Sequence, residues 1–144
     1  MNFTDKIALV TGGGNGIGRA SALRFAELGA AVVVVDNDAT AAADTARRIT
    51  EQGGNALDVA ADVSRSDQVQ AYVAATVHKH GRIDCFFNNA GIEGRVAPTA
   101  EYDEDVFDSV IAVNVKGVFL GLRHVLPVML EQGSGTVVNS ASIA

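Results

Sequence analysis

Short apolar runs alternate along this chain with longer stretches in which apolar residues recur at helical spacing. Each run is rich in valine, leucine, isoleucine or phenylalanine and ends near glycine, asparagine or aspartate, as buried strands do. The pattern therefore predicts five strands, within KIALVTGGG (6–14), AAVVVVD (30–36), ALDVAADV (56–63), IDCFF (83–87) and GTVVNSAS (135–142).

The stretches between these runs predict helices. The first covers about 16–28 and is followed by Gly29, a residue type that suits the position after a helix. The second covers about 38–52. A third follows Ser64, where SRSD resembles a capping box, and ends at Gly81. Residues from about 103 to 131 are expected to form two helices, with a break near 115–117.

The order of these elements is strand, helix, strand, helix, repeated. The strands are apolar without alternation, which indicates that helices cover both faces of the sheet. Right-handed crossovers then give a doubly wound, parallel α/β sheet, a Rossmann fold. Because no linker, composition shift or repeat divides the sequence, residues 1–144 are expected to form a single domain.

The amino-acid composition mainly excludes certain classes of partner and site. A net charge of −6 disfavours nucleic acid and anionic membranes as partners. The N-terminus lacks the pattern of a signal peptide, and no uninterrupted apolar run approaches the roughly 20 residues that span a bilayer. Cys85 is the only cysteine, and the histidines at 78, 80 and 124 show no metal-ligand spacing, so no metal site is predicted. These features favour a cytoplasmic protein.

The loop TGGGNGIGRA lies between the first strand and the first helix, where this fold binds nucleotide phosphates. Glycines let the backbone approach an anion closely, and the helix N-terminus attracts negative charge. A plain turn would look similar, but the strand before the loop and the helix after it favour a nucleotide site. The candidate cofactor-binding residues in this loop are Gly12, Gly14, Asn15, Gly16, Ile17 and Gly18.

Asp36 ends the second strand, where a carboxylate accepts hydrogen bonds from the adenosine ribose and repels a 2′-phosphate. Asn37 follows it, at a position where an NADP-binding protein often has a basic residue. NAD is therefore the expected cofactor. The alternative is that Asp36 belongs to a helix cap, although Asn37 and Asp38 could serve equally well there.

Four motifs in order carry a family resemblance: TGGGNGIG (11–18), NNAG (88–91), NVKG (114–117) and VNSAS (138–142). Together, over the whole chain, they resemble the N-terminal part of the classical short-chain dehydrogenase/reductase (SDR) family. The resemblance implies that Asn88, Ala90 and Gly91 lie beside the cofactor, and that Asp62 and Val63 contact the adenine ring. Asp62 could instead be a plain loop residue before the Ser64 cap.

The resemblance also assigns catalytic residues. It implies that Asn114 holds a water and passes protons toward a lysine, although an Asn that merely sits in a bent helix remains an alternative. Ser142 would hydrogen-bond the substrate oxygen, with Ser140 beside it on the same strand face; Ala141 departs from the serine that the family usually has there. The two serines could also simply end a strand.

The family's chemistry further needs Tyr-x-x-x-Lys, and neither Tyr72 nor Tyr102 has a lysine four positions later. The chain is therefore expected to be truncated after the fifth strand, inactive by itself, and left with a bare apolar edge there. The whole protein is expected to be an NAD(H)-dependent oxidoreductase, and a homo-oligomer, that interconverts a secondary alcohol, cyclic alcohols included, and its ketone. A non-catalytic dinucleotide-binding protein and a 3-oxoacyl-carrier-protein reductase remain alternatives.

Overall fold

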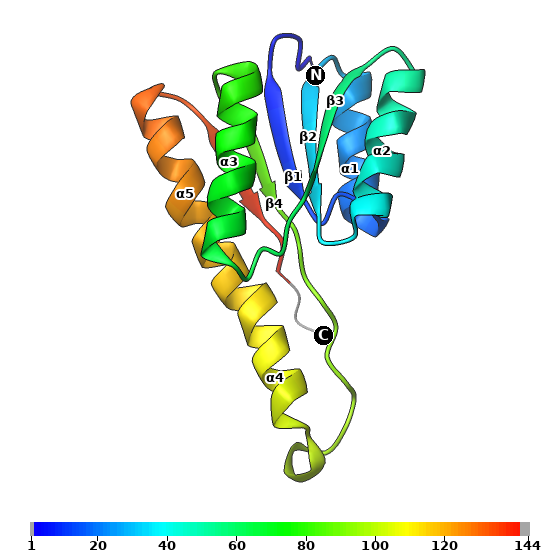
Figure 1. Ribbon diagram of the computed structural model, residues 1–144, viewed down its shortest axis with the longest axis vertical. Helices are drawn as coiled ribbons and strands as arrows, with labels where there is room; N and C mark the ends of the chain where they lie inside the picture. Colours follow the sequence, from blue (N-terminus) through cyan, green and yellow to red (C-terminus); the bar gives the residue numbers. More distant parts are fainter. Residues whose placement is uncertain (1, 142–144) are drawn as a thin grey trace.

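The sheet consists of parallel strands in the order β3-β2-β1-β4-β5 (Figure 1). The computed structural model describes residues 2–141. The chain runs outward from β1 to β3 and then returns to place β4 on the other side of β1, which confirms the predicted doubly wound fold. The strands are β1 (Ile7–Thr11), β2 (Ala31–Asp36), β3 (Asn55–Ala60), β4 (Cys85–Asn88) and β5 (Thr136–Asn139).

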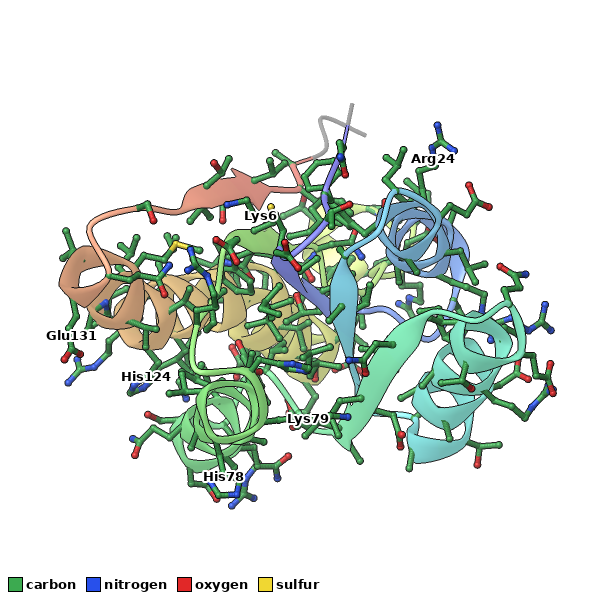
Figure 2. All side chains as sticks on the ribbon, turned by 90° about the horizontal axis from the view of Figure 1, so that it is seen from above. Lys6, Arg24, His78, Lys79, His124 and Glu131 are labelled. Atoms are coloured by element: carbon green, nitrogen blue, oxygen red, sulfur yellow. The ribbon has the colours of Figure 1, made fainter. Side chains whose placement is uncertain are left out.

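Helices cover both faces of this sheet. Figure 2 shows α1 and α2 on one face, with α3 and α5 on the other. Polar side chains on these helices point outward, as those of Arg24 and His78 do, whereas Lys79 reaches β3 and donates to the Ala56 carbonyl at 3.2 Å. The helices are α1 (Gly16–Glu27), α2 (Ala39–Glu51), α3 (Ser66–His80), α4 (Glu104–Ile111) and α5 (Val118–Glu131).

Two hydrophobic cores form because successive strand residues point to opposite faces. Leu9 and Val33 belong to the core beneath α3 and α5, whereas Val10 and Val34 belong to the core beneath α1 and α2. Burial on both faces is therefore confirmed for β1 and β2. It does not hold for the two edge strands, β3 and β5, most of whose residues are partly or fully exposed.

The expected break near 115–117 is wrong. A π-helical segment, Ala112–Gly117, joins α4 to α5 without interruption. The resulting helix, Glu104–Glu131, is long and apolar enough to cross a membrane by length and composition alone. One such helix is weak evidence for a membrane segment, because core helices meet the same measure. Here α5 packs beside α3 and buries Leu120, Val125 and Met129 in the core.

Candidate dinucleotide site

The glycine loop after β1 packs too closely for side chains at several of its positions, of which Gly18 and Gly12 meet backbone atoms. A Cβ on Gly18 would lie 2.0 Å from the Gly12 carbonyl oxygen. Gly12 itself has a φ of +63° and would place a Cβ 3.0 Å from the Ala90 Cα atom. The glycines thus let β1, the start of α1 and the segment after β4 meet at one point, with the backbone exposed to a ligand.

The N-terminus of α1 retains a positive end that no side chain within residues 2–141 caps. Asn15 is the N-cap residue, yet its side chain makes no capping hydrogen bond, and no acidic residue lies in the first turn. Ile17, in that turn, is 72% exposed. Uncapped backbone N–H groups at a helix N-terminus, with the helix dipole behind them, form a site for a phosphate.

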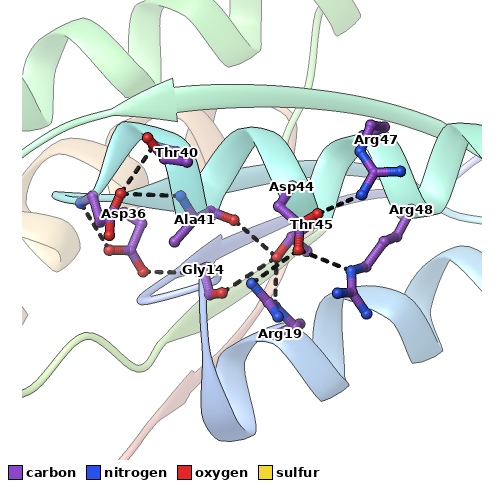
Figure 3. A network of polar contacts seen from close by, with 10 residues as sticks. Gly14, Arg19, Asp36, Thr40, Ala41, Asp44, Thr45, Arg47 and Arg48 are labelled. Carbon is purple, nitrogen blue, oxygen red and sulfur yellow. Dashed lines mark hydrogen bonds and ion pairs between the residues drawn. The ribbon is translucent and has the colours of Figure 1, made fainter.

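Asp36 is held by two backbone N–H groups. Its Oδ2 accepts from Gly14 at 2.8 Å and its Oδ1 accepts from Asp38 at 3.0 Å (Figure 3). Asp36 is therefore not the N-cap of α2; that role belongs to Asp38, whose Oδ1 accepts from Thr40 and Ala41. The carboxylate of Asp36 is oriented in advance, and it links the glycine loop to the end of β2.

A cavity of about 100 Å³ opens beside these residues, at the carboxyl ends of β1, β2 and β4. Such a position, where the strand order changes direction, is where open α/β sheets bind ligands. None of the lining residues is basic, and two are carboxylates. The lining consists of Gly12, Asp36, Asn37, Ala61, Asp62, Val63, Ala90, Gly91, Ile92 and Val113.

The predicted cofactor residues fall into three groups. Gly12, Asp36, Asp62, Val63, Ala90 and Gly91 line the cavity. Gly14, Asn15, Gly16, Ile17 and Gly18 form the adjoining loop and first helical turn. Asn88 does not line the cavity: it is buried, and its Nδ2 donates to Val118 O at 3.0 Å and to Asn139 Oδ1 at 3.1 Å.

The capping box expected at Ser64 does not form. Instead, Asp62 Oδ1 accepts from the Ser64 backbone N–H at 2.9 Å and from its hydroxyl at 2.7 Å. α3 begins two residues later, after Arg65, whose side chain makes no capping bond. Gln68 Oε1 accepts from the Asp62 N–H at 2.6 Å and so anchors the loop from within α3. These bonds hold Asp62 at the rim of the cavity.

Thr11 and Asn89, whose roles no sequence motif indicated, join β1 to the segment after β4. The fully buried Thr11 hydroxyl accepts from the backbone N–H groups of Asn89 and Ala90, at 3.0 and 3.1 Å. The Asn89 side chain donates to Thr11 O at 3.0 Å and accepts from the Ser140 hydroxyl at 3.1 Å. A polar residue that ends an otherwise apolar strand was the available signal for Thr11.

Asn114 lies in the π-helical segment, a type of distortion that occurs often at functional sites. Its side-chain amide pairs with the backbone of one residue, Ile92: Oδ1 accepts from the N–H and Nδ2 donates to the carbonyl, both at 2.9 Å. Asn114 therefore fixes the segment after Gly91 against the long helix, one residue from Val113 at the cavity wall. Ser142 lies outside the described residues.

The chain belongs to the short chain dehydrogenase family, whose sequence model matches residues 6–144. Among curated relatives, levodione reductase of Leifsonia aquatica is 50% identical over 98% of this chain and 54% of its own length. Cyclohexanol dehydrogenase of an Acinetobacter species is 39% identical over 99% of this chain and 57% of its own length. The chain thus spans about half the length of the curated relatives it matches.

Solved structures agree with this assignment. NAD+-bound xylitol dehydrogenase superposes with a TM-score of 0.97 at 39% identity, covering 100% of this chain and 55% of that one. A metagenomic short-chain oxidoreductase in complex with NADP gives a TM-score of 0.93 at 35% identity, covering 99% of this chain and 64% of that one. Similar structures therefore hold either dinucleotide.

Proposed function

We propose that this chain forms the NAD(H)-binding part of an oxidoreductase that interconverts a secondary alcohol, cyclic alcohols included, and its ketone. The observation that carries the proposal is the cavity that joins Gly12, Asp36, Asp62 and Ala90 at the carboxyl ends of the strands. The names of two relatives, a levodione reductase and a cyclohexanol dehydrogenase, support the reaction class.

The residues present fit a dinucleotide. The uncapped turn of α1 would receive the pyrophosphate, and Asp36 would accept hydrogen bonds from ribose hydroxyls. Asp62 and Val63 would border the adenine, with Ala90 and Gly91 toward the nicotinamide. A bound nicotinamide would supply the hydride chemistry. The chain's own contribution is to hold this group in a rigid place, because Asp36, Asp62 and Asn89 are each fixed by hydrogen bonds.

NAD(H) is preferred over NADP(H) in this proposal because the cavity lining holds two carboxylates and no basic residue. A 2′-phosphate would meet Asp36 without a compensating cation. Titration of the purified chain with NADH and NADPH, followed by nucleotide fluorescence, tests the preference. Asn37→Arg should strengthen NADPH binding about tenfold by supplying a cation, whereas Asn55→Arg, at the far end of β3, should not. Tighter binding of NADPH by the unaltered chain would contradict the preference.

We further propose that these 144 residues alone turn over no alcohol. Neither tyrosine lines the cavity: Tyr72 is fully buried, which raises its pKa well above the usual range, and the Tyr102 hydroxyl accepts from the Arg95 N–H at 3.0 Å. In the proposed enzyme, Asn114 and Ser142 would take part in proton transfer and substrate binding. Incubation with NAD+ and cyclohexanol should give no NADH; steady turnover would contradict this proposal.

Two alternatives from other classes have distinct outcomes. A non-catalytic dinucleotide-binding protein would bind NADH. It would not oxidise an alcohol, even in a longer form that carries a Tyr-x-x-x-Lys motif. A 3-oxoacyl-carrier-protein reductase would prefer a 3-oxoacyl thioester to a cyclic ketone in the same assay.

The net charge of −6 supports the absence of nucleic-acid and anionic-membrane partners, and a cytoplasmic location is part of the proposal.

The proposed protein is a homo-oligomer that uses the long helix. Four apolar side chains at intervals of four residues are 41–57% exposed along it: Phe107, Ile111, Val115 and Phe119. In an antiparallel copy centred on residue 113, Phe107 faces Phe119, Ile111 faces Val115, and the acidic Asp103 faces Arg123. Sedimentation analysis should show dimers or larger species that Val115→Glu dissociates. A monomer at all concentrations would contradict this.

A further inference from the structure

An arginine in the first turn of α1 is bound by two neighbouring residues of α2. Arg19 Nε donates to the Thr45 hydroxyl at 3.0 Å, and its terminal nitrogen lies 3.3 Å from the Asp44 carboxylate (Figure 3). Asp44 also binds Arg47 and Arg48, at 2.6 and 2.9 Å, so its carboxylate is held from several sides. The start of α1 is therefore attached to α2 by a charged, oriented contact.

Thr45 is fully buried in the middle of α2. Its hydroxyl proton can go to the Ala41 carbonyl at 3.2 Å, the usual bond of a helical threonine, or to the Gly14 carbonyl at 3.5 Å. Neither choice requires Arg19. The hydroxyl oxygen nevertheless accepts from Arg19, so Thr45 contacts both the glycine loop and the first turn of the helix that follows it.

The glycine loop is consequently fixed at both ends on the β2–α2 unit. At one end, Asp36 accepts from the Gly14 N–H, and a Cβ on Gly14 would lie only 2.7 Å from the Ala41 Cβ. At the other end, Arg19 is bound by Thr45 and Asp44, and its own N–H donates to Asn15 O at 3.0 Å. Between these anchors lie the uncapped N–H groups proposed to bind the pyrophosphate.

We infer that Thr45 and Asp44, by binding Arg19, act as positioning residues that hold the glycine loop in the conformation that binds a dinucleotide. Neither residue lines the cavity, so the effect on the ligand passes through the backbone of 14–19. The inference about binding rests on the proposed function, whereas the inference about the loop does not.

A matched pair of variants tests this. Thr45→Val removes the hydroxyl and keeps the shape. Thr76→Val does the same in α3, where the equally buried Thr76 donates only to Tyr72 O at 2.7 Å and lies outside the cavity lining. We expect Thr45→Val to weaken NADH binding about tenfold, since its bond to a charged group is lost. It should also speed amide hydrogen exchange in residues 13–19. Thr76→Val should change neither, and Thr45→Ser should stay within about twofold of the unaltered chain.

The two readouts separate the possible failures. An unchanged NADH affinity in Thr45→Val, or an equal loss in Thr76→Val, would overturn the inference whatever the thermal stabilities. If the unaltered chain binds no NADH, the proposed function fails, and hydrogen exchange decides the positioning role alone. Faster exchange confined to 13–19 in Thr45→Val would then support it, and exchange like that of Thr76→Val would overturn it.

Discussion

The N-terminal and C-terminal regions of the chain differ in how many of their apolar and polar side chains find partners among the described residues. In residues 6–68, every residue of β1 and the central four of β2 are buried, and Asp36, Asp62 and Thr45 find hydrogen-bond partners within the same region. In residues 92–141, α4 has no buried residue and β5 is mostly exposed. The long helix of this region, Glu104–Glu131, presents a stripe of exposed apolar side chains.

The difference indicates what each region needs in order to be stable. The glycine-loop region carries its own core and orients its own polar groups, so it should be sensitive to single substitutions in its interior. The second region exposes a stripe of apolar side chains on the long helix, and no described residue covers this stripe. Substitutions there should change association more than folding.

The largest expected effect comes from Gly18→Ala. Its Cβ would lie 2.0 Å from the Gly12 carbonyl oxygen, which belongs to rigid backbone and cannot move aside. We expect a loss of about 3 kcal/mol in the free energy of unfolding and a fall in Tm of about 10 °C. Thermal unfolding followed by circular dichroism measures it. Gly91→Ala is the control, because its Cβ would meet its nearest neighbour at an ordinary 3.4 Å; equal losses would contradict the steric account.

Asn88→Ala tests the junction between the two regions. Its buried amide joins β4 to the long helix at Val118 and to β5 at Asn139, so removal leaves polar groups without partners. We expect a loss of about 2 kcal/mol, measured by urea unfolding. Asn55→Ala, at an exposed position on β3, should cost less than about 0.5 kcal/mol. A similarly small cost for Asn88→Ala would mean that the junction contributes little.

The sequence predicted the fold well because its signals are local. Apolar runs, helical spacing and glycines at the loop each depend on neighbouring residues, and the sheet of five parallel strands follows from their order. The π-helical segment could not be predicted in this way. An extra residue in one helical turn interrupts the regular spacing of apolar positions, and this interruption suggested a break near 115–117.

The site was predictable where a residue acts through its own chemistry, and not where its partner is distant in sequence. Gly12 and Asp36 follow from what a glycine or a carboxylate does at the end of a strand. The role of Thr11 depends on Asn89, 78 residues away. Ser64 is a different case, because its possible partners are local and it binds Asp62 rather than capping α3. Where a side chain can bond to either of two groups, tertiary packing decides which partner it takes, and a single sequence does not show that packing.

A smaller effect is expected from Asp84→Asn, which removes a charge at the start of β4. Burial alone would raise the pKa of Asp84, but bonds from Arg82 and from the Ile7 N–H outweigh it and hold the pKa below its usual 3.8. The ionised carboxylate therefore stabilises the fold above that value, and this stabilisation is lost as pH falls through the lowered pKa. At pH 7 the variant should be about 1.5 kcal/mol less stable.

The pH dependence distinguishes this account from a simple packing defect. Urea unfolding at several pH values should show the gap between Asp84→Asn and the unaltered chain shrinking as pH falls below about 4. Asp67→Asn is the control: Arg65 lowers the pKa of this carboxyl too, but both side chains are exposed, so solvent screens the pair and stability should hardly change. A gap for Asp84→Asn that is independent of pH would contradict the electrostatic explanation.

The smallest effect is expected for Val138→Thr in β5, and it sharpens the comparison most directly because the same substitution can be made in β2. Val34→Thr exchanges a methyl group for a hydroxyl in a fully buried residue of β2, where no water can reach it, and should cost about 2 kcal/mol. Val138→Thr makes the same exchange in β5, where the side chain is 54% exposed, and should leave the unfolding free energy within about 0.5 kcal/mol. If the two costs are equal, β5 must be covered in solution by a surface absent from residues 2–141, and the contrast between the regions would not describe the working protein.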